Sequence, residues 1–162
     1  MSEAILKLHE LLEYRDGALY WKVDRGSQKC KGKKAGCENL GYMKFRVREI
    51  GGSMLVHRAI FAMHHGYFPA EIDHINGNKL DNRIENLREV SRSQNRMNIG
   101  RNGQNKSGCK NVYFYKNKWG VRIIVDKKRL FLGVFEDLEL ADLVAHAARE
   151  KYHGAYANHG VN

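Results

Sequence analysis

Apolar residues recur at two periods along this chain, one typical of helices and one typical of strands. Residues 2–14, SEAILKLHELLEY, show the helical period and predict one short amphipathic helix. Its apolar positions are Ile5, Leu8, Leu11 and Leu12. After the turn formers Asp16 and Gly17, the segments ALYWKV and YMKFRVREI alternate between apolar and polar residues, with a glycine-rich and lysine-rich loop between them. The first part of the chain therefore predicts a helix followed by a small antiparallel sheet.

The middle of the chain predicts a helix, a hairpin and a second helix. The segment SMLVHRAIFAMHHGY has helical spacing and ends at Gly66. EIDHI then reads as a short strand, NGNKLDN is rich in turn formers, and RIENLREV can return as extended chain. Ser91 and Gln94 stand three residues apart, which is capping-box spacing, so a helix is predicted to begin at Ser91.

The last third of the chain predicts a second, separate domain. Residues 99–107, IGRNGQNKS, are polar and contain glycine, so a linker is predicted at 99–106. Beyond it, KNVYFY, KWGVRIIVD and KRLFLGVF read as strands separated by Lys-Asn and Lys-Lys turns. The alanine-rich segment DLELADLVAHAAREKYHG predicts a helix closed by Gly154. The expected fold class is α+β, with a helix and strands over 1–55, a core at 56–98 and a C-terminal domain over 107–158.

Charge adds an expected partner to this plan. The 162 residues carry 28 Lys and Arg against 18 Asp and Glu, which gives a formal net charge of +10. Residues 1–70 hold 12 basic and 7 acidic side chains, residues 71–100 hold 5 and 5, and residues 101–162 hold 11 and 6. Two basic flanks around a balanced centre suit an anionic polymer, although a merely soluble basic protein would also show such an excess.

Cysteine use and hydropathy bound the compartment. Cys30, Cys37 and Cys109 form no CxxC pair, so neither a disulfide framework nor a zinc box is indicated. The sequence contains no apolar run near the roughly 20 residues of a membrane span, and the N-terminus lacks a signal-peptide pattern. We expect a soluble protein of the reducing cytoplasm with no membrane partner.

The segment from Ile72 to Asn95 carries the candidate chemistry. The predicted hairpin and helix bring its two ends together, and such a cluster suits phosphodiester hydrolysis, which needs a base, a cation and rigid positioning. The imidazole of His74 can act as the base near neutral pH. Asp73 offers a carboxylate oxygen and Asn95 an amide oxygen, hard ligands that favour magnesium or manganese over zinc. Adjacent residues on a strand face opposite sides, so Asp73 can hold the metal while His74 meets the water.

The same residues also have ordinary structural interpretations. Asn-Gly and Asp-Asn are common turn pairs, and a lone histidine is more often structural than catalytic. The lysines of the N-terminal loop can be a solvated charge run or a phosphate-contacting arm. For His57 a packing role and a phosphate contact remain alternatives. The residues with a possible phosphate contact are Lys31, Lys33, Lys34 and Arg58.

Residues 56–98, VHRAIFAMHHGYFPAEIDHINGNKLDNRIENLREVSRSQNRMN, resemble the HNH endonucleases. The resemblance is to the phage and intron-encoded branch in which asparagine replaces the last histidine of the motif. It implies a ββα-metal fold with His74 as general base and Asp73 and Asn95 as metal ligands. It further implies that Asn86 is the middle residue of the motif, whose hydrogen bonds hold the hairpin loop and thus His74.

Residues 107–158 are similar to the APETALA2-type DNA-binding domain, on the segments KNVYFY, KWGVRI, LFLGVF and YHGAYAN. In that family a three-stranded sheet lies in the major groove, and a helix packs behind it. Period-two alternation puts Trp119, Val121, Ile123 and Val125 in the core. Alternation and the family pattern together assign the DNA face and its rim, with exposed aromatics that only stabilise the sheet as the alternative. The assigned residues are Lys110, Tyr113, Tyr115, Lys118, Arg122, Arg129 and Phe131.

The sequence thus predicts a magnesium-dependent endonuclease that hydrolyses phosphodiester bonds in duplex DNA, with manganese as a possible substitute. One site per chain predicts nicking by a monomer, while double-strand cleavage would need a homodimer or sequential events. The resemblance implies a homing endonuclease of phage origin that acts in the host cytoplasm. The alternative is a non-catalytic, sequence-specific DNA-binding regulator that keeps the HNH scaffold. An RNA-directed protein is disfavoured, because a major-groove sheet suits B-form better than A-form helices.

Overall fold

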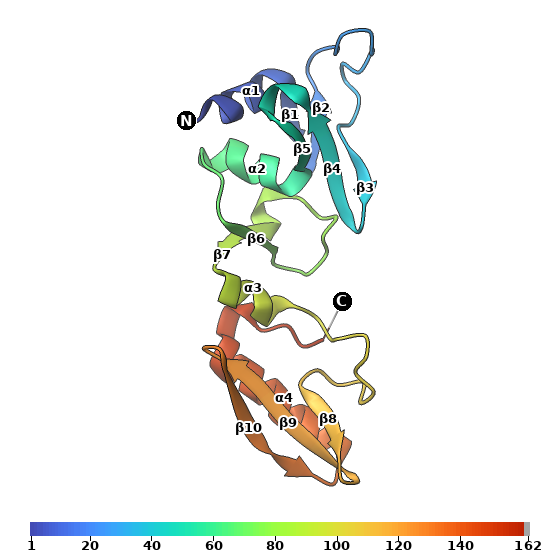
Figure 1. The fold of residues 1–162 in the computed structure, drawn as a ribbon, viewed down its shortest axis with the longest axis vertical. Coiled ribbons are helices and arrows are strands. Elements are labelled where there is room, and N and C mark those ends of the chain that lie inside the picture. The colour runs from blue at the N-terminus through green and yellow to red at the C-terminus, as the bar shows by residue number, and fades with distance from the viewer. Residues whose placement is uncertain (161–162) are drawn as a thin grey trace. The chain divides into compact units, whose positions relative to one another are not determined.

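A computed structural model describes residues 1–160 of the chain. The backbone divides into two compact units, Met1–Glu89 and Val90–Asn162 (Figure 1). Helices and small antiparallel sheets occur in both units, so the fold is mixed α and β as the sequence predicts. Among the described residues, none of the helices has the length and apolar character needed to cross a membrane.

The chain opens with α1 (Glu3–Leu11), which is shorter than the predicted helix. Residues 12–14 belong instead to β1 (Leu12–Arg15), which pairs with β2 (Ala18–Trp21). The helical prediction was wrong here because the hairpin turn at Asp16 and Gly17, both at positive φ, pairs this segment with β2. Leu12 is buried in the strand and would also face the core in a helix, so its apolar character does not distinguish the two structures.

A three-stranded antiparallel sheet follows, in the order β3-β4-β5. Its strands are β3 (Cys37–Asn39), β4 (Tyr42–Val47) and β5 (Gly52–Leu55), with a 3₁₀ turn, η1 (Arg48–Ile50), between the last two. Helix α2 (Val56–His65) starts three residues later than the predicted segment, because residues 53–55 pair with β4. It ends at Gly66, whose φ of 80° is the left-handed conformation that glycine adopts readily.

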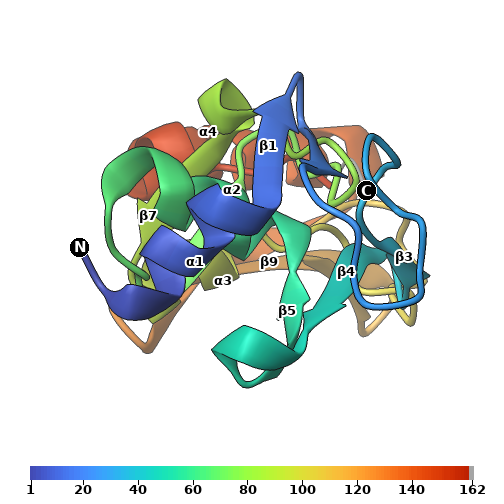
Figure 2. The same ribbon diagram turned by 90° about the horizontal axis from the view of Figure 1, so that it is seen from above.

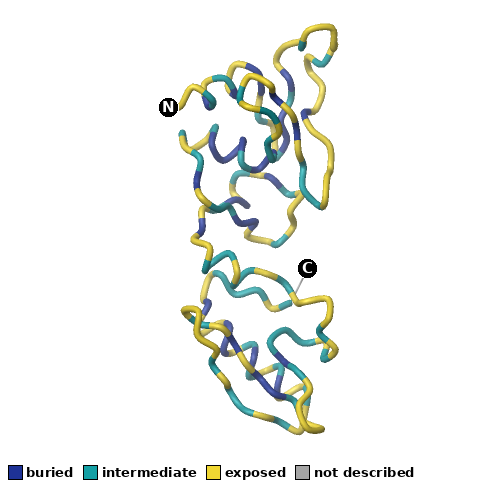
Figure 3. The backbone as a smooth tube through the Cα atoms, viewed as in Figure 1, coloured by how far each residue is buried: buried dark blue, intermediate teal, exposed yellow. Residues whose placement is uncertain are grey.

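One hydrophobic core joins these elements. Helix α1 packs against α2, and α2 packs against β4 and β5 (Figures 1 and 2). The buried face of α2 appears as a nearly continuous dark stretch in Figure 3. The core is built from Leu8, Leu11, Leu12, Leu19, Trp21, Ala35, Phe45, Val47, Val56, Ala59, Ile60, Phe61 and Leu87. This packing fixes α2 and the strands behind the candidate site.

The predicted hairpin is present as a two-stranded sheet of β6 (Glu71–His74) and β7 (Leu87–Val90). Residues 75–86 connect the strands, and η2 (Ile84–Asn86) forms the last turn before β7. Helix α3 (Arg92–Asn98) follows β7 directly in the chain and begins after Ser91, as predicted. Its capping box is complete, because the Ser91 hydroxyl accepts from Gln94 N and the Gln94 side chain accepts from Ser91 N.

The second unit contains the predicted three strands and a helix. Its sheet has the order β10-β9-β8, formed by β8 (Val112–Tyr115), β9 (Lys118–Val125) and β10 (Lys128–Phe135). Helix α4 (Leu138–His153) packs against this sheet, and a short η3 (Gly154–Tyr156) follows. Val121 and Ile123 are buried under α4, as period-two alternation predicts.

The hairpin tips of this sheet are formed by residues other than glycine. Lys116 and Asn117 make the first turn with φ of 47° and 59°. The second turn is Asp126-Lys127, with φ of 47° and 66°, one residue earlier than the predicted Lys-Lys pair. Both tips are exposed (Figure 3). The predicted linker at 99–106 lies inside the second compact unit, whose boundary falls before α3.

Candidate active site

Asp73 and His74 lie at the end of β6, and both side chains are buried, at 6% and 5% exposure. Their polar partners differ. Asp73 Oδ2 accepts hydrogen bonds from Nε and Nη2 of Arg88, at 2.9 and 2.7 Å. His74 Nε2 lies 3.0 Å from the side-chain oxygen of Asn82. Different surroundings for adjacent residues are what strand geometry requires, since successive side chains face opposite sides.

The loop after β6 is organised by Asn86, which is 7% exposed. Its side-chain oxygen accepts from Asn76 N at 3.0 Å, and its amide nitrogen donates to Asn76 Oδ1 at 3.0 Å and to the Asp81 carbonyl at 2.8 Å. The backbone joins in, because Ile75 N donates to the Asn86 carbonyl at 2.9 Å. Asn86 therefore ties both ends of the loop to the start of β7. Its part in cleavage stays a prediction.

The side-chain oxygen of Asn82 lies within hydrogen-bonding distance of the His74 imidazole. The turn-forming pattern of the sequence indicates only a loop-shaping role for Asn82. Asn82 is 2% exposed, and its amide nitrogen donates to the Leu80 carbonyl at 3.3 Å, which turns its oxygen toward His74. An amide oxygen only accepts, so Nε2 of His74 donates this hydrogen bond. Nothing in the sequence marks Asn82, because turn asparagines are ordinarily exposed and only burial distinguishes this one.

The neighbouring turns behave as the sequence predicts. Asn76 Oδ1 accepts from Asn78 N, and Asn78 Oδ1 accepts from Leu80 N, at 2.9 and 3.0 Å. Arg83 donates to both carboxylate oxygens of Asp81 at 2.8 Å, and this guanidinium holds the pKa of Asp81 well below its usual range. The loop that carries Asn82 is therefore fixed by its own side chains.

His57 packs against His74 from α2. The two ring centroids are 5.0 Å apart with the planes at 76°, and the Tyr42 ring lies 5.6 Å from His57 and 6.3 Å from His74. His57 is 5% exposed, and among the described residues its Nδ1 has no hydrogen-bond partner. Burial, helped by His74 and Arg58, lowers the pKa of His57 to about 4. His57 is therefore neutral at physiological pH and packs beside the site.

The predicted phosphate contacts divide into two kinds. Arg58 donates from Nη2 to the Pro69 carbonyl at 2.9 Å, so its guanidinium fixes the segment that leads into β6. Lys31, Lys33 and Lys34 are all exposed on the loop between β2 and β3. Phosphate binding by these four residues stays a prediction. The three lysines are accessible to a phosphate because they are exposed.

The predicted metal ligands come from different elements, Asp73 from β6 and Asn95 from the first turn of α3. Their oxygen donors suit magnesium or manganese, and a buried carboxylate such as Asp73 requires a compensating cation. In this structure Arg88 supplies one, with its Nη2 at 2.7 Å from Oδ2. The donor chemistry of Asp73 fits a hard divalent ion that shares the carboxylate with Arg88. Because Asn95 belongs to the second unit, the ligand pair stays a prediction.

Another group of possible ligands lies in the second unit. His146, Glu150 and His159 have ligand atoms within 4.8 Å of one another. The two imidazoles stack at 3.7 Å with planes 16° apart, so their in-plane lone pairs run nearly parallel and do not converge on one point. Arg149 Nε also donates to His159 Nδ1 at 3.3 Å. This arrangement does not suit a bound cation.

The predicted DNA face is a single face of the β8–β10 sheet. Cross-strand register pairs Tyr113 with Gly120, Phe131 with Arg122, and Arg129 with Ile124, and paired residues share a face. The Arg122 guanidinium lies 4.6 Å from the centre of the Tyr113 ring. Gly120 makes room for that ring, because a Cβ there would meet Tyr113 atoms at 2.6 to 2.9 Å.

The two predicted rim lysines differ. Lys118 is exposed and pairs with Glu136 at 3.0 Å. The ammonium of Lys110 donates to the carbonyls of Met97 and Asn158, at 3.1 and 2.7 Å. Burial, with a smaller effect of Arg149, lowers the pKa of Lys110 to about 8. Lys110 is thus engaged within the second unit, which favours a structural role over a DNA contact.

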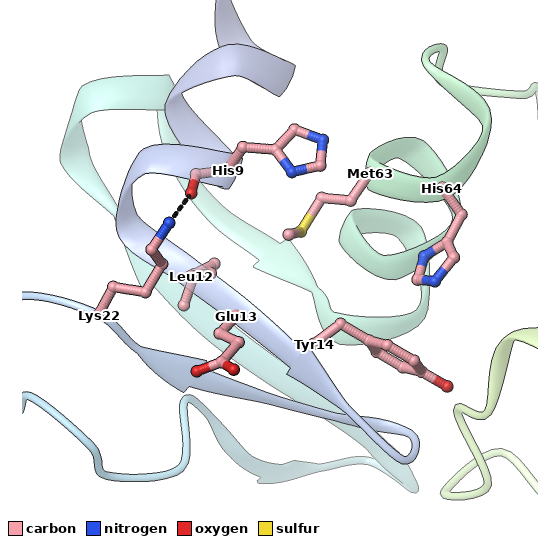
Figure 4. A pocket seen from close by; sticks show the side chains of 7 residues that line it. All are labelled: His9, Leu12, Glu13, Tyr14, Lys22, Met63 and His64. Carbon is pink, nitrogen blue, oxygen red and sulfur yellow. Dashed lines mark hydrogen bonds between the residues drawn. The ribbon is translucent and has the colours of Figure 1, made fainter.

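A cavity of about 300 Å³ in the first unit contains none of the predicted site residues (Figure 4). It is lined by His9, Leu12, Glu13, Tyr14, Lys22, Met63 and His64. Lys22 Nζ donates to the His9 carbonyl at 2.9 Å, the bond drawn in Figure 4. His64 Nδ1 contacts the Ile60 carbonyl at 3.0 Å within α2, and its ring packs edge-on against Tyr14. His64 is therefore hydrogen-bonded within its own helix.

The comparison with known proteins finds a match in the segment that contains Asp73, His74, Asn82 and Asn86. Residues 54–97 match the HNH endonuclease family. The match begins within β5 and ends within α3, so it spans α2 and the β6–β7 hairpin. No curated protein and no solved structure matches the chain. The HNH match indicates a DNA nuclease domain, and HNH nucleases generally use a divalent metal ion.

Proposed function

We propose that this protein is a metal-dependent endonuclease that hydrolyses phosphodiester bonds in duplex DNA. The observation that carries the proposal is the buried His74 imidazole within the HNH match, held at Nε2 by Asn82 and adjacent in sequence to the buried Asp73 carboxylate. A hydrogen bond to one ring nitrogen fixes the direction of the imidazole, and a general base needs such positioning. This supports a role in chemistry more strongly than a role in packing.

In the proposed reaction a water molecule attacks the scissile phosphorus and gives one proton to the His74 imidazole. The Nε2–H bond to Asn82 keeps the ring in the tautomer that can accept this proton and stabilises the imidazolium that forms. The bond from phosphorus to the 3′ oxygen breaks, and that oxygen leaves and takes up a proton from solvent water to become the 3′ hydroxyl. Asn86 maintains the loop that carries Asn82. The chain therefore supplies the base and its orientation through residues within one hairpin.

The proposed metal ligands are Asp73 and Asn95. Their hard oxygen donors favour magnesium, with manganese as a substitute. When bound, such a cation would neutralise charge on the scissile phosphate and on the leaving oxygen. Arg88, which already contacts Asp73 Oδ2, would keep the carboxylate ionised and fixed in direction.

The second unit is proposed to dock the enzyme on duplex DNA through an APETALA2-like sheet. Its support is the shared face defined by the register of β8, β9 and β10, which carries both basic and aromatic side chains. The proposed contacts are Tyr113, Tyr115, Lys118, Arg122, Arg129 and Phe131. A three-stranded sheet with such side chains is compatible with the width of the major groove.

The biological setting that fits this proposal is a homing endonuclease of phage origin, acting in the host cytoplasm. One HNH hairpin per chain predicts that a monomer nicks one strand, and that a homodimer or a second event is needed to cut both. The basic character of the chain, with a net charge of +10, supports binding to DNA ahead of cleavage.

The test is cleavage of supercoiled plasmid with and without magnesium, by the wild type and by His74→Ala. We expect open-circular product from the wild type only when metal is present, with at least a 100-fold loss in His74→Ala. His9→Ala, which removes an exposed histidine of α1, is the matched control and is expected to cut like the wild type. Equal cutting by His74→Ala would show that another group is the base.

The second candidate function is a non-catalytic, sequence-specific DNA-binding regulator. It is favoured by the Arg88–Asp73 ion pair, which leaves the buried carboxylate balanced without a metal. A wild type that binds DNA but leaves plasmids intact across a broad screen of metals and sequences would establish the regulator and exclude the nuclease.

A further inference from the structure

The β3–β4–β5 sheet has one face in the core and one face outside. Along β4 the residues Phe45 and Val47 are buried at 4% and 0% exposure, while Lys44 and Arg46 are exposed. Strand alternation therefore places Tyr42, Lys44 and Arg46 on the outer face. Register adds Cys37 beside Lys44 and Ser53 beside Arg46. The outer face is polar and basic.

This outer face is hollowed. A groove of about 460 Å³ is lined by Trp21, Arg25, Gln28, Gly36, Cys37, Asn39, Lys44, Phe45, Arg46 and Ser53. Three of these side chains are cationic, and no carboxylate is among them. The carboxylate beside the groove is that of Glu49, 3.6 Å from Arg25 Nη2. The groove thus carries a net positive charge that Glu49 offsets only in part.

Arg25 forms one edge of the groove and is held in place. Its guanidinium lies 4.4 Å from the centre of the Trp21 ring, and Nη1 donates to the Arg46 carbonyl at 2.8 Å. Cations that are fixed by packing lose little conformational entropy when they bind an anion. The side chains of Lys44 and Arg46, in contrast, are exposed to solvent along the strand.

Strand β4, which lines the groove with Lys44 and Arg46, also carries Tyr42, whose ring lies near the candidate active site. The ring of Tyr42 lies 6.3 Å from the His74 ring, and Lys79 Nζ lies 5.0 Å from the Tyr42 ring. Alternate residues of a strand are about 6.6 Å apart, so Arg46 lies about 13 Å along β4 from Tyr42. Two cationic side chains, Lys44 and Arg46, therefore follow Tyr42 along β4, at increasing distance from it.

We propose that this groove binds the sugar-phosphate backbone of the DNA strand that flanks the scissile phosphate. The proposal rests on the proposed function, since it takes His74 to mark the scissile position. The cations are spaced along a strand and do not converge on a point, which suits a polyanion better than a single small anion. Ser53 and Asn39 offer a hydroxyl and an amide for further phosphate contacts. In this proposal the cationic contacts to the phosphates come from Lys44 and Arg46.

The experiment measures binding of a short mixed-sequence DNA duplex by fluorescence anisotropy, between about 50 and 200 mM salt. Every protein carries His74→Ala, so that binding is read without cleavage. The test variant adds Lys44→Ala and Arg46→Ala. The control instead adds Lys7→Ala and Lys22→Ala, which remove the same charge from the same unit but lie outside the groove. Thermal midpoints verify that both variants fold.

Loss of two phosphate contacts should make the plot of log association constant against log salt concentration less steep by about 2 in the test variant. The control should show little change in this slope. An unchanged slope in the test variant would overturn the proposal, and so would equal losses in both variants, which would reflect overall charge alone. If the slope changes in the test variant alone but the wild type cuts no plasmid, the nuclease proposal is contradicted, while DNA binding by the groove is supported.

Discussion

At the residue scale, the features that single out this site are burial and hydrogen bonding of a few polar side chains. Sequence reasoning proposed Asp73, His74 and Asn86 as site residues because their spacing fits hydrolysis and the HNH pattern, and their roles stay predictions. It missed Asn82, whose identity is that of an ordinary turn residue and whose 2% exposure only the folded chain reveals. It also left His57 between alternatives, because ring contacts with His74 depend on how α2 packs against β6.

Replacement of Asn82 tests the orientation of His74. Asn82→Leu keeps a similar volume but removes the acceptor from His74 Nε2, so we expect cleavage to fall about 10- to 100-fold, as for other residues that orient a catalytic group. Asn82→Asp retains an acceptor and is expected to recover most of the rate with an altered pH profile. The measurement is the rate of plasmid nicking against pH. Asn102→Ala, which removes an exposed asparagine outside this loop, serves as the control, and equal losses in Asn82→Leu and Asn82→Asp would refute orientation.

The buried His57 predicts a pH dependence of stability. Its pKa is about 4 when folded and about 6.5 when unfolded, so the unfolded chain takes up the proton first as pH falls. The neutral ring contributes fully above pH 6.5, and about 3 kcal/mol is lost as pH falls from 6.5 to 4. Urea unfolding at several pH values measures this loss. His57→Phe, which cannot titrate, should lose about 3 kcal/mol less over that window, and an identical loss would contradict the assignment.

At the element scale, the sequence predicted elements well where a local signal fixed them. The Ser91 capping box and the left-handed Gly66 defined the start of α3 and the end of α2. Residues 12–14 were predicted as helix because Leu12 fits the helical period, but strand pairing with β2 overrides that preference. Strand β3 was taken as loop for the converse reason, since its short, exposed CEN segment has no apolar pattern and is ordered by pairing with β4.

The capping box at the start of α3 gives an element-scale prediction. Ser91→Ala removes the hydroxyl that accepts from Gln94 N, and should lower the free energy of unfolding by about 1 kcal/mol. Asn95 lies in the first turn of this helix, so fraying should also weaken metal-dependent cleavage if Asn95 is a ligand. Urea unfolding and nicking rates at limiting magnesium measure the two effects. Ser93→Ala, inside the same helix, is the control, and equal stability losses would argue against a capping contribution.

At the scale of the whole molecule, net charge follows from the sequence alone, while the predicted domain boundaries stay a prediction. Polar, glycine-containing residues marked 99–106 as a linker, yet the compact units divide between Glu89 and Val90. Lys110 shows why, because its ammonium binds the Met97 carbonyl and thereby joins the end of α3 to the second unit. A contact between a side chain and a distant carbonyl has no signature in composition.

The turns at Lys116-Asn117 and Asp126-Lys127 carry a further consequence. All four residues occupy the left-handed region, where a residue other than glycine costs about 1 kcal/mol. Two of them are lysines at the exposed tips of the sheet that is proposed to face DNA. Glycine would fit both turns with less strain but would carry no charge. The protein therefore accepts a cost in folding stability at these tips, where one turn carries the cation Lys116 and the other carries the oppositely charged pair Asp126 and Lys127.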